Sequence, residues 1–272
     1  MTFARQTESI PSAWELDIGL RLEALKTNDL TREFREVVRT ELPMAIVDGR
    51  QCVSFSTCDY LDLSRHAAVV KAVQETVQLH GVGTGGSRYL AGTAPLHNEL
   101  ERKLARFHCK PEAVVFPTGY MVNPAVMSSI TTEQDVIFSD ALNHASIIDG
   151  CRFSRSAVSV WRHNDPEHLE SVLRSTPVKG RRLIVCESLY SMTGEFAPLK
   201  DICDLSLRFG AVLVLDEAHA VGVYGDHGEG YAAASGLAEQ IDILSGTQSK
   251  SVGTLGGYVA TSHDATTLIR ST

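Results

Sequence analysis

Residues 183–219, LIVCESLYSMTGEFAPLKDICDLSLRFGAVLVLDEAH, decide the fold. Two short apolar runs, 183–186 and 212–215, flank a segment with helical spacing at 199–209. Each run is continuous rather than alternating, which is typical of a strand buried on both faces. Two such strands joined through a helix predict a parallel pair with a crossover helix.

The same alternation extends through most of the chain. Further apolar runs lie at 113–116, 136–138, 158–161 and 241–244, and helix-like segments lie at 123–129 and 166–175. The sequence therefore predicts an α/β fold, with a mainly parallel sheet and helices on both of its faces.

Outside this alternating region, in about the first hundred residues and the last eight, the sequence predicts helices and a hairpin instead of buried strands. Leucines at helical spacing predict one or two amphipathic helices within 12–40, forming an N-terminal arm. Residues 44–56 predict a hairpin that turns at Asp48-Gly49. Helices are expected at 66–80, ended by Gly81, at 94–107 after a glycine-rich loop, and in a short piece at 265–272.

Polar groups follow the predicted strands. Because ligands bind beyond the carboxyl ends of strands in open α/β sheets, these residues are expected to converge. Thr118, Gly119 and Tyr120 follow the run at 113–116, and His144 follows the run at 136–138. The remaining residues are Glu187 with Ser191 after 183–186, Asp216 with His219 after 212–215, and Thr247 with Lys250 after 241–244.

Each of these residue types has a chemical use. A lysine amine forms Schiff bases with carbonyl cofactors, a carboxylate keeps a pyridine nitrogen protonated, and a glycine that opens a helix leaves N–H groups free for phosphate. Taken singly, each has a commoner structural explanation: an Asp as a turn or cap, a His as a packed side chain, a Lys as surface. Their joint placement favours a functional site.

Composition narrows the function further. The net charge is −8 with no basic run, which argues against nucleic acid and anionic membranes as partners. Six scattered cysteines without a C-x-x-C pair suggest reduced thiols and a cytoplasmic location. No apolar stretch resembles a secretory signal or approaches the length of a membrane span.

Two other kinds of site are compatible with parts of the sequence. Residues 81–86 could form a dinucleotide loop, but the segment before them is predicted to be helical where that motif needs a strand. Asp216, His219 and His227 could be drawn as a metal site, although the spacing of the histidines is not that of a helical pair.

A set of ordered motifs resembles the α-oxoamine synthases, which depend on pyridoxal 5'-phosphate. The resemblance covers the chain from about residue 50 to its end. It rests on DYL (59–61), GTGGSRYLAGT (83–93), NHASI (143–147), RHNDPEHL (162–169), ESLYSMTG (187–194), DEAHAVGVYG (216–225) and SGTQSKSVGTLGGY (245–258).

The resemblance implies roles for the candidate residues. Lys250 would hold the cofactor as a Schiff base and remove the α-proton of the substrate. Asp216 would pair with the ring nitrogen, His144 would stack on the ring, and His219, with Ser191 nearby, would bond the phenolic oxygen. The phosphate would lie on the Thr118 loop, held by the backbone of Gly119 and Tyr120 and by Thr247, and Glu187 would contact the bound acid.

The implied fold is the large domain of a fold type I transferase, acting as a homodimer on an acyl-CoA and a small amino acid. We expect 1–50 to be an N-terminal arm or small-domain segment and 51–272 to be the cofactor-binding domain, with the family's C-terminal small domain absent. The implied reaction is a decarboxylating condensation that gives an aminoketone.

Within the family, 8-amino-7-oxononanoate synthase is the preferred type. The serine palmitoyltransferase, 2-amino-3-ketobutyrate ligase and 5-aminolevulinate synthase types are the alternatives, and Ser87 stands where aminolevulinate synthases usually have Thr. An aminotransferase or aldolase of the same fold, and a non-catalytic remnant or interaction subunit, are the remaining hypotheses. Cys58 and Asp62 replace an Asn and a Gly that are usual in the family.

Overall fold

The computed structural model describes residues 12–40 and 42–272, in two compact units, 1–56 and 57–272. In the first unit, α1 (Ala13–Thr27) starts at Ser12 with a capping box, in which Ser12 and Glu15 each accept a hydrogen bond from the other's backbone N–H. A three-stranded antiparallel sheet follows, made of β1 (Val37–Arg39), β2 (Met44–Val47) and β3 (Arg50–Val53). Asp48 and Gly49, both with positive φ, form the predicted hairpin turn.

The predicted amphipathic helices within 12–40 are wrong in two respects. The helix ends at Thr27, and the β-branched pair Val37-Val38 lies in a strand. Helix α1 also buries none of its residues. Leu16 and Leu20 lie on one side of the helix, whereas Ile18 and Leu22 lie on the other, so no single apolar face exists.

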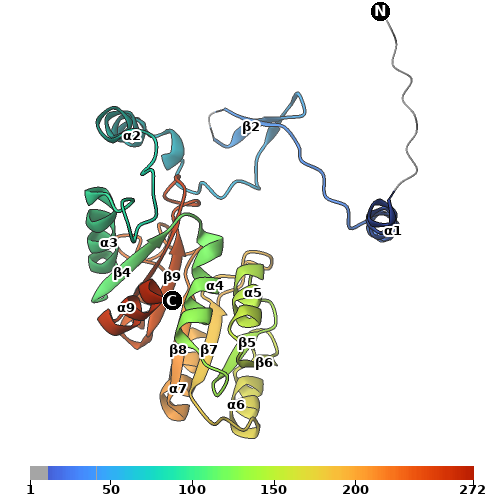
Figure 1. The fold of residues 1–272 in the computed structure, drawn as a ribbon, viewed down its shortest axis with the longest axis vertical. Helices are drawn as coiled ribbons and strands as arrows, with labels where there is room; N and C mark the ends of the chain where they lie inside the picture. Colours follow the sequence, from blue (N-terminus) through green and yellow to red (C-terminus); the bar gives the residue numbers. More distant parts are fainter. Residues whose placement is uncertain (1–11, 41) are drawn as a thin grey trace, which may run out of the picture. The chain divides into compact units, whose positions relative to one another are not determined.

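The second unit is built on a seven-stranded sheet (Figure 1). All of its strands are parallel except β10, so the mainly parallel sheet is confirmed. In spatial order the strands are β4 (Glu112–Phe116), β10 (Gly257–Thr261), β9 (Ile243–Thr247), β8 (Ala211–Asp216), β7 (Arg182–Glu187), β5 (Val136–Asp140) and β6 (Ala157–Trp161).

Two features of this sheet differ from the sequence prediction. Strand β10 was not predicted, and the last predicted run at 241–244 is displaced, because the strand starts at Ile243 and continues to Thr247. Residues Ser245, Gly246 and Thr247 are therefore part of β9 itself. Polar and small residues do not read as a strand by hydropathy, although their burial is complete here.

Helices cover both faces of the sheet, as predicted. Side chains alternate along the strands: Leu183 and Val185 of β7 pack with α4, α5 and α9, and Ile184 and Cys186 pack with α6 and α7. The helices of this unit are α2 (Ala67–His80), α3 (Pro95–Phe107), α4 (Gly119–Ile130), α5 (Ala145–Phe153), α6 (Pro166–Ser175), α7 (Leu199–Phe209), α8 (Tyr231–Ala234) and α9 (His263–Ser271), with single turns η1 (Leu63–Arg65) and η2 (Ala238–Gln240).

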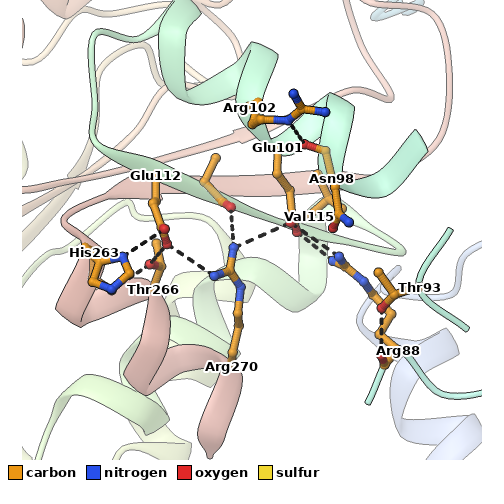
Figure 2. A network of polar contacts seen from close by, with 11 residues as sticks. Arg88, Thr93, Asn98, Glu101, Arg102, Glu112, Val115, His263, Thr266 and Arg270 are labelled. Carbon is orange, nitrogen blue, oxygen red and sulfur yellow. Dashed lines mark hydrogen bonds and ion pairs between the residues drawn. The ribbon is translucent and has the colours of Figure 1, made fainter. Parts of the chain in front are cut away.

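A polar network ties the edge of the sheet to two helices and a loop (Figure 2). Glu101 of α3 is buried and accepts hydrogen bonds from Arg88 Nη1 at 2.6 Å and from the backbone N–H of Val115 at 3.0 Å. Arg270 of α9 lies 3.5 Å from the same carboxylate and 3.2 Å from Glu112 of β4. One buried carboxylate thus joins α3, β4, α9 and the glycine-rich loop.

We expect Glu101→Gln to destabilise the chain by about 2 kcal/mol or more, because two guanidinium groups lose their shared anion. Glu99→Gln is the matched control on the same helix. The Glu99 side chain is 48% exposed and forms a surface pair with Lys103, so its loss should leave the urea midpoint close to that of the wild type. Urea unfolding of both variants measures the difference, and equal midpoints would show that the network adds no stability.

Candidate active site

Strands β7 and β8 end in register at one edge of the sheet, and β9 runs beside them and continues to Thr247. Glu187 of β7 is the register partner of Asp216 of β8, and Asp216 is the partner of Ser245 of β9. Register partners project to the same face of a sheet, so the three side chains are adjacent. Parallel pairing therefore places two carboxylates and a hydroxyl together from distant parts of the sequence.

Asp216 is held as a hydrogen-bond acceptor. It is 8% exposed, and it accepts bonds from Asn123 Nδ2 at 2.7 Å and from the Ala218 N–H at 2.9 Å. Asn123 also lies 3.0 Å from Ser146 Oγ and accepts from Ser245 Oγ at 3.1 Å. Sequence reasoning missed Asn123, and the available signal was an amide followed by Pro124 inside an otherwise apolar helix.

Lys250 follows β9 and faces His219. Its Nζ lies 2.7 Å from His219 Nε2. Burial lowers the pKa of Lys250, and Asp216, and then Cys58 and Glu187 when they are ionised, act in the opposite direction. Burial, and next the charge of Lys250, lower the pKa of His219 to about 4. His219 is therefore neutral at neutral pH, and Lys250 is a lysine whose free-amine form is made more accessible.

Glu187 and His144 also line the site. The backbone N–H of His144 donates to Glu187 Oε1 at 2.6 Å, and the His144 ring caps α5 by accepting from the Ser146 N–H. Burial, and next the charge of Asp216, raise the pKa of Glu187 to about 8. Glu187 is thus a carboxyl that can carry a proton at neutral pH, whereas the imidazole of His144 stays at the surface of the site.

The start of α4 closes the remaining side. Thr118 caps the helix by accepting a hydrogen bond from Met121, which leaves the first N–H groups without partners inside the helix. Gly119 meets Thr247 so closely that a Cβ added at position 119 would lie 2.6 Å from Thr247 Oγ1. A glycine is required here, and a helix start beside a hydroxyl is suited to an anion.

These groups line one cavity of about 280 Å³. Of the residues predicted from the sequence, it is lined by Thr118, Gly119, Tyr120, His144, Glu187, Asp216, Thr247 and Lys250. His219 reaches it through Lys250. Ser191 does not line it and lies on an exposed turn, because the chain leaves the sheet edge after Tyr190. The side chain of Tyr120 bonds Asp149.

The cavity fits pyridoxal phosphate by the chemistry of its donor set. It offers an amine of lowered pKa, a buried carboxylate held as an acceptor, and a helix N-terminus with a neighbouring hydroxyl at the far side. The two other kinds of site gain no support. The segment before the 81–86 loop is helix α2, not a strand, and the described residues contain no group of three or more potential metal-ligating side chains.

Within the described part of the chain, no helix is long and apolar enough to cross a membrane.

Residues 50–271 match the family model described as aminotransferase class I and II. The chain belongs to that family. It is 39% identical to 8-amino-7-oxononanoate synthase of Geobacter metallireducens over 89% of this chain and 62% of the relative. It is 40% identical to 5-aminolevulinate synthase of Rickettsia felis over 96% of this chain and 64% of the relative.

Solved structures agree with these relatives. Serine palmitoyltransferase of Sphingomonas wittichii superposes with a TM-score of 0.85 at 34% identity, covering 96% of this chain and 66% of that one. A structure of SPT with pyridoxal phosphate gives 0.86 at 35% identity, with the same coverage. The resemblance to α-oxoamine synthases, the fold type I architecture and pyridoxal phosphate as the cofactor are thereby confirmed. This family member spans about two thirds of the length of these relatives.

Gly119→Ala should reduce the affinity for pyridoxal phosphate at least about tenfold, because the new Cβ must displace Thr247 from the helix start. Gly19→Ala, in a helix where an added Cβ meets nothing within 4 Å, is the control and should leave that affinity unchanged. Fluorescence titration with the cofactor measures both. Wild-type affinity in Gly119→Ala would mean that the phosphate lies elsewhere.

Proposed function

We propose that the chain is the cofactor-binding part of an acyl-CoA:amino acid C-acyltransferase, with 51–272 as the cofactor domain and 1–50 as an arm. The reaction would be a condensation with loss of carbon dioxide that yields an aminoketone. The observation that carries the proposal is Lys250 Nζ at 2.7 Å from a neutral His219, beside the buried carboxylate of Asp216.

Each lining residue would have a separate role in the reaction. Pyridoxal phosphate, when bound, supplies an electron sink that stabilises a carbanion. Lys250 would anchor it and take the α-proton, for which the lowered pKa of its amine is suited. Asp216 would hold a positive charge at the ring nitrogen, and the start of α4 with Thr247 would hold the phosphate. His144 would cover the ring.

Glu187 has properties suited to the substrate carboxylate. With a pKa of about 8 it carries a proton at neutral pH, so it can donate a hydrogen bond to an anion instead of repelling it. Deprotonation above that pKa would add a second negative charge beside Asp216. A carboxylate substrate should therefore bind less well as pH rises through about 8.

The finer proposal is a specificity like that of 8-amino-7-oxononanoate synthase. Relatives at about 40% identity include this type and 5-aminolevulinate synthase, and similar solved structures include serine palmitoyltransferases and an 8-amino-7-oxononanoate synthase. Ser87 favours the first over the second. A panel of acyl-CoA esters of graded length with small amino acids separates these three types from one another and from the 2-amino-3-ketobutyrate ligase type. The aminotransferase and aldolase hypotheses predict turnover without an acyl-CoA.

We expect borohydride reduction after addition of pyridoxal phosphate to label Lys250, with a visible absorption band before reduction. Lys250→Met should lose the band and the label, whereas Lys200→Met, which removes an exposed amine, should keep both. Peptide mapping locates the label. A label spread over surface lysines would overturn the cofactor role of Lys250 and would favour a non-catalytic remnant or interaction subunit.

We further propose that the chain acts as a homodimer in the cytoplasm. Helix α2 buries none of its residues, and Val70, Val73 and Val77 make an apolar stripe at helical spacing on its surface. A second copy would cover this stripe. The six cysteines are all free, which agrees with a reducing compartment.

Val73→Asp should shift the chain from dimer toward monomer, because a charge would enter an apolar interface. Gln78→Asp, more than a quarter turn away on α2, should leave the dimer intact. Sedimentation velocity distinguishes the species. A wild-type chain that sediments as a monomer at high concentration contradicts the proposal.

A further inference from the structure

The segment around Tyr60 is fixed against the lysine turn by two close approaches. A Cβ at Gly253 would lie 2.2 Å from the backbone nitrogen of Ser64, and a Cβ at Gly222 would lie 2.6 Å from the Cβ of Ser251 and 3.5 Å from Leu61. Both glycines have positive φ. The turn that carries Tyr60 is therefore packed directly on the segments that carry Lys250 and His219.

The turn itself is conformationally demanding. The Asp62 N–H bonds the carbonyl oxygen of Asp59, and Asp62 adopts the left-handed conformation with φ of 51°. The family's usual glycine would adopt this conformation freely, and Asp does so at some cost. The chain keeps the strained turn, and its result is the placement of the Tyr60 side chain.

Tyr60 ends a line of hydrogen bonds that reaches Lys250. The Tyr60 hydroxyl lies 2.7 Å from His219 Nδ1, and His219 Nε2 lies 2.7 Å from Lys250 Nζ. Both ring nitrogens of His219 are thus engaged, one by a phenol and one by an amine. No role was assigned to Tyr60 from the sequence, although it belongs to the DYL motif.

The donors and acceptors in this line are coupled. An ammonium has three donors and no acceptor, so beside a charged Lys250 the neutral His219 must accept at Nε2 and carry its proton on Nδ1. A neutral Lys250 amine can accept from Nε2–H, which leaves Nδ1 as an acceptor. The Tyr60 hydroxyl can serve both forms, because it donates as well as accepts.

We propose that Tyr60 is a positioning residue that fixes His219 with Nε2 toward Lys250, and that the tautomer of His219 follows the charge of Lys250. With this line of bonds, Lys250 can change between proton acceptor and proton donor while both nitrogens of the half-buried His219 keep a partner. A phenylalanine at position 60 would keep the aromatic ring but lose the hydroxyl, which leaves His219 Nδ1 without this partner and lets the imidazole turn toward water.

In the hydrogen-bonded line Tyr60–His219–Lys250, only the lysine carries a charge at neutral pH. The Tyr60 hydroxyl holds its proton, since burial and next the Cys58 thiol raise its pKa to about 12. Any proton that moves along the line does so as a change of tautomer, with no charged histidine. The titratable groups that face His219 are Lys250, Asp216, His144 and Tyr60, and those that face Lys250 further include Cys58 and Glu187.

The first test follows His219 by NMR in the cofactor-free chain with labelled histidine, and His219→Gln identifies the resonance. In Tyr60→Phe the ring should lose its fixed orientation, and the pKa of His219 should rise from about 4 toward 6.5 as water reaches it. Tyr224→Phe, which removes a phenol whose ring packs on Phe196, is the control and should leave His219 unchanged. An unchanged His219 titration in Tyr60→Phe, with the fold intact by circular dichroism, overturns the proposal.

The second test uses the same wild-type sample across the ionisation of Lys250. The nitrogen shifts of His219 should change from a protonated Nδ1 to a protonated Nε2 as the lysine loses its charge, and Lys250→Met should abolish the change. A tautomer that stays constant overturns the coupling. Because the proposal deepens the proposed function through Lys250, both tests omit cofactor and substrate, so their failure is distinguishable from the absence of acyltransferase activity.

Discussion

Two carboxyl groups lie side by side at the ends of adjacent strands, and the remainder of the site is organised around this constraint. Glu187 and Asp216 are register partners and both are buried. Burial disfavours a charged carboxylate, and a neighbouring negative charge disfavours it again. Hydrogen-bond donors offset this cost. The amide of Asn123 donates to Asp216, the backbone N–H of His144 donates to Glu187, and the amine of Lys250 lies nearby. The two carboxyl groups therefore have different surroundings. Glu187 can hold a proton, whereas Asp216 faces the amide of Asn123.

The donors are present because of how helices follow strands. Helices α4 and α5 start within a few residues of the ends of β4 and β5, so their unpaired N–H groups and capping side chains collect at the same sheet edge. Thr118 and His144 are both N-caps, and both line the cavity. The fold thus supplies the positive side of the site through backbone geometry, with Lys250 as the added cation.

The sheet and most of the cavity could be predicted from the sequence because both depend on local patterns. Continuous apolar runs marked five strands close to their observed positions, and the residues after them mark the site. What failed depends on tertiary packing. Ser245 to Thr247 lie in a buried strand despite their polarity, and α1 is a helix without an apolar face. Asn123 was missed because its partners, Asp216 and Ser245, are distant in sequence.

Ser191 shows the limit of reasoning by strand order. It comes four residues after the end of β7, and His219 comes three after the end of β8, yet the chain turns away from the edge after the buried Tyr190. The path of the loop after a strand decides whether a residue faces the site or points away from it. For Tyr60 the difficulty is greater, because two glycines that permit its approach, Gly222 and Gly253, lie far along the chain from it.

Lys250 lies in the connection between β9 and β10, which is the point where the sheet departs from parallel order. Both flanking strands are fully buried and hydrogen-bonded to each other, so the lysine turn is the end of a hairpin inside the sheet. Both ends of this turn are therefore tethered to a well-protected part of the sheet. The amine is thus a fixed point, and whatever reacts with it must come to it.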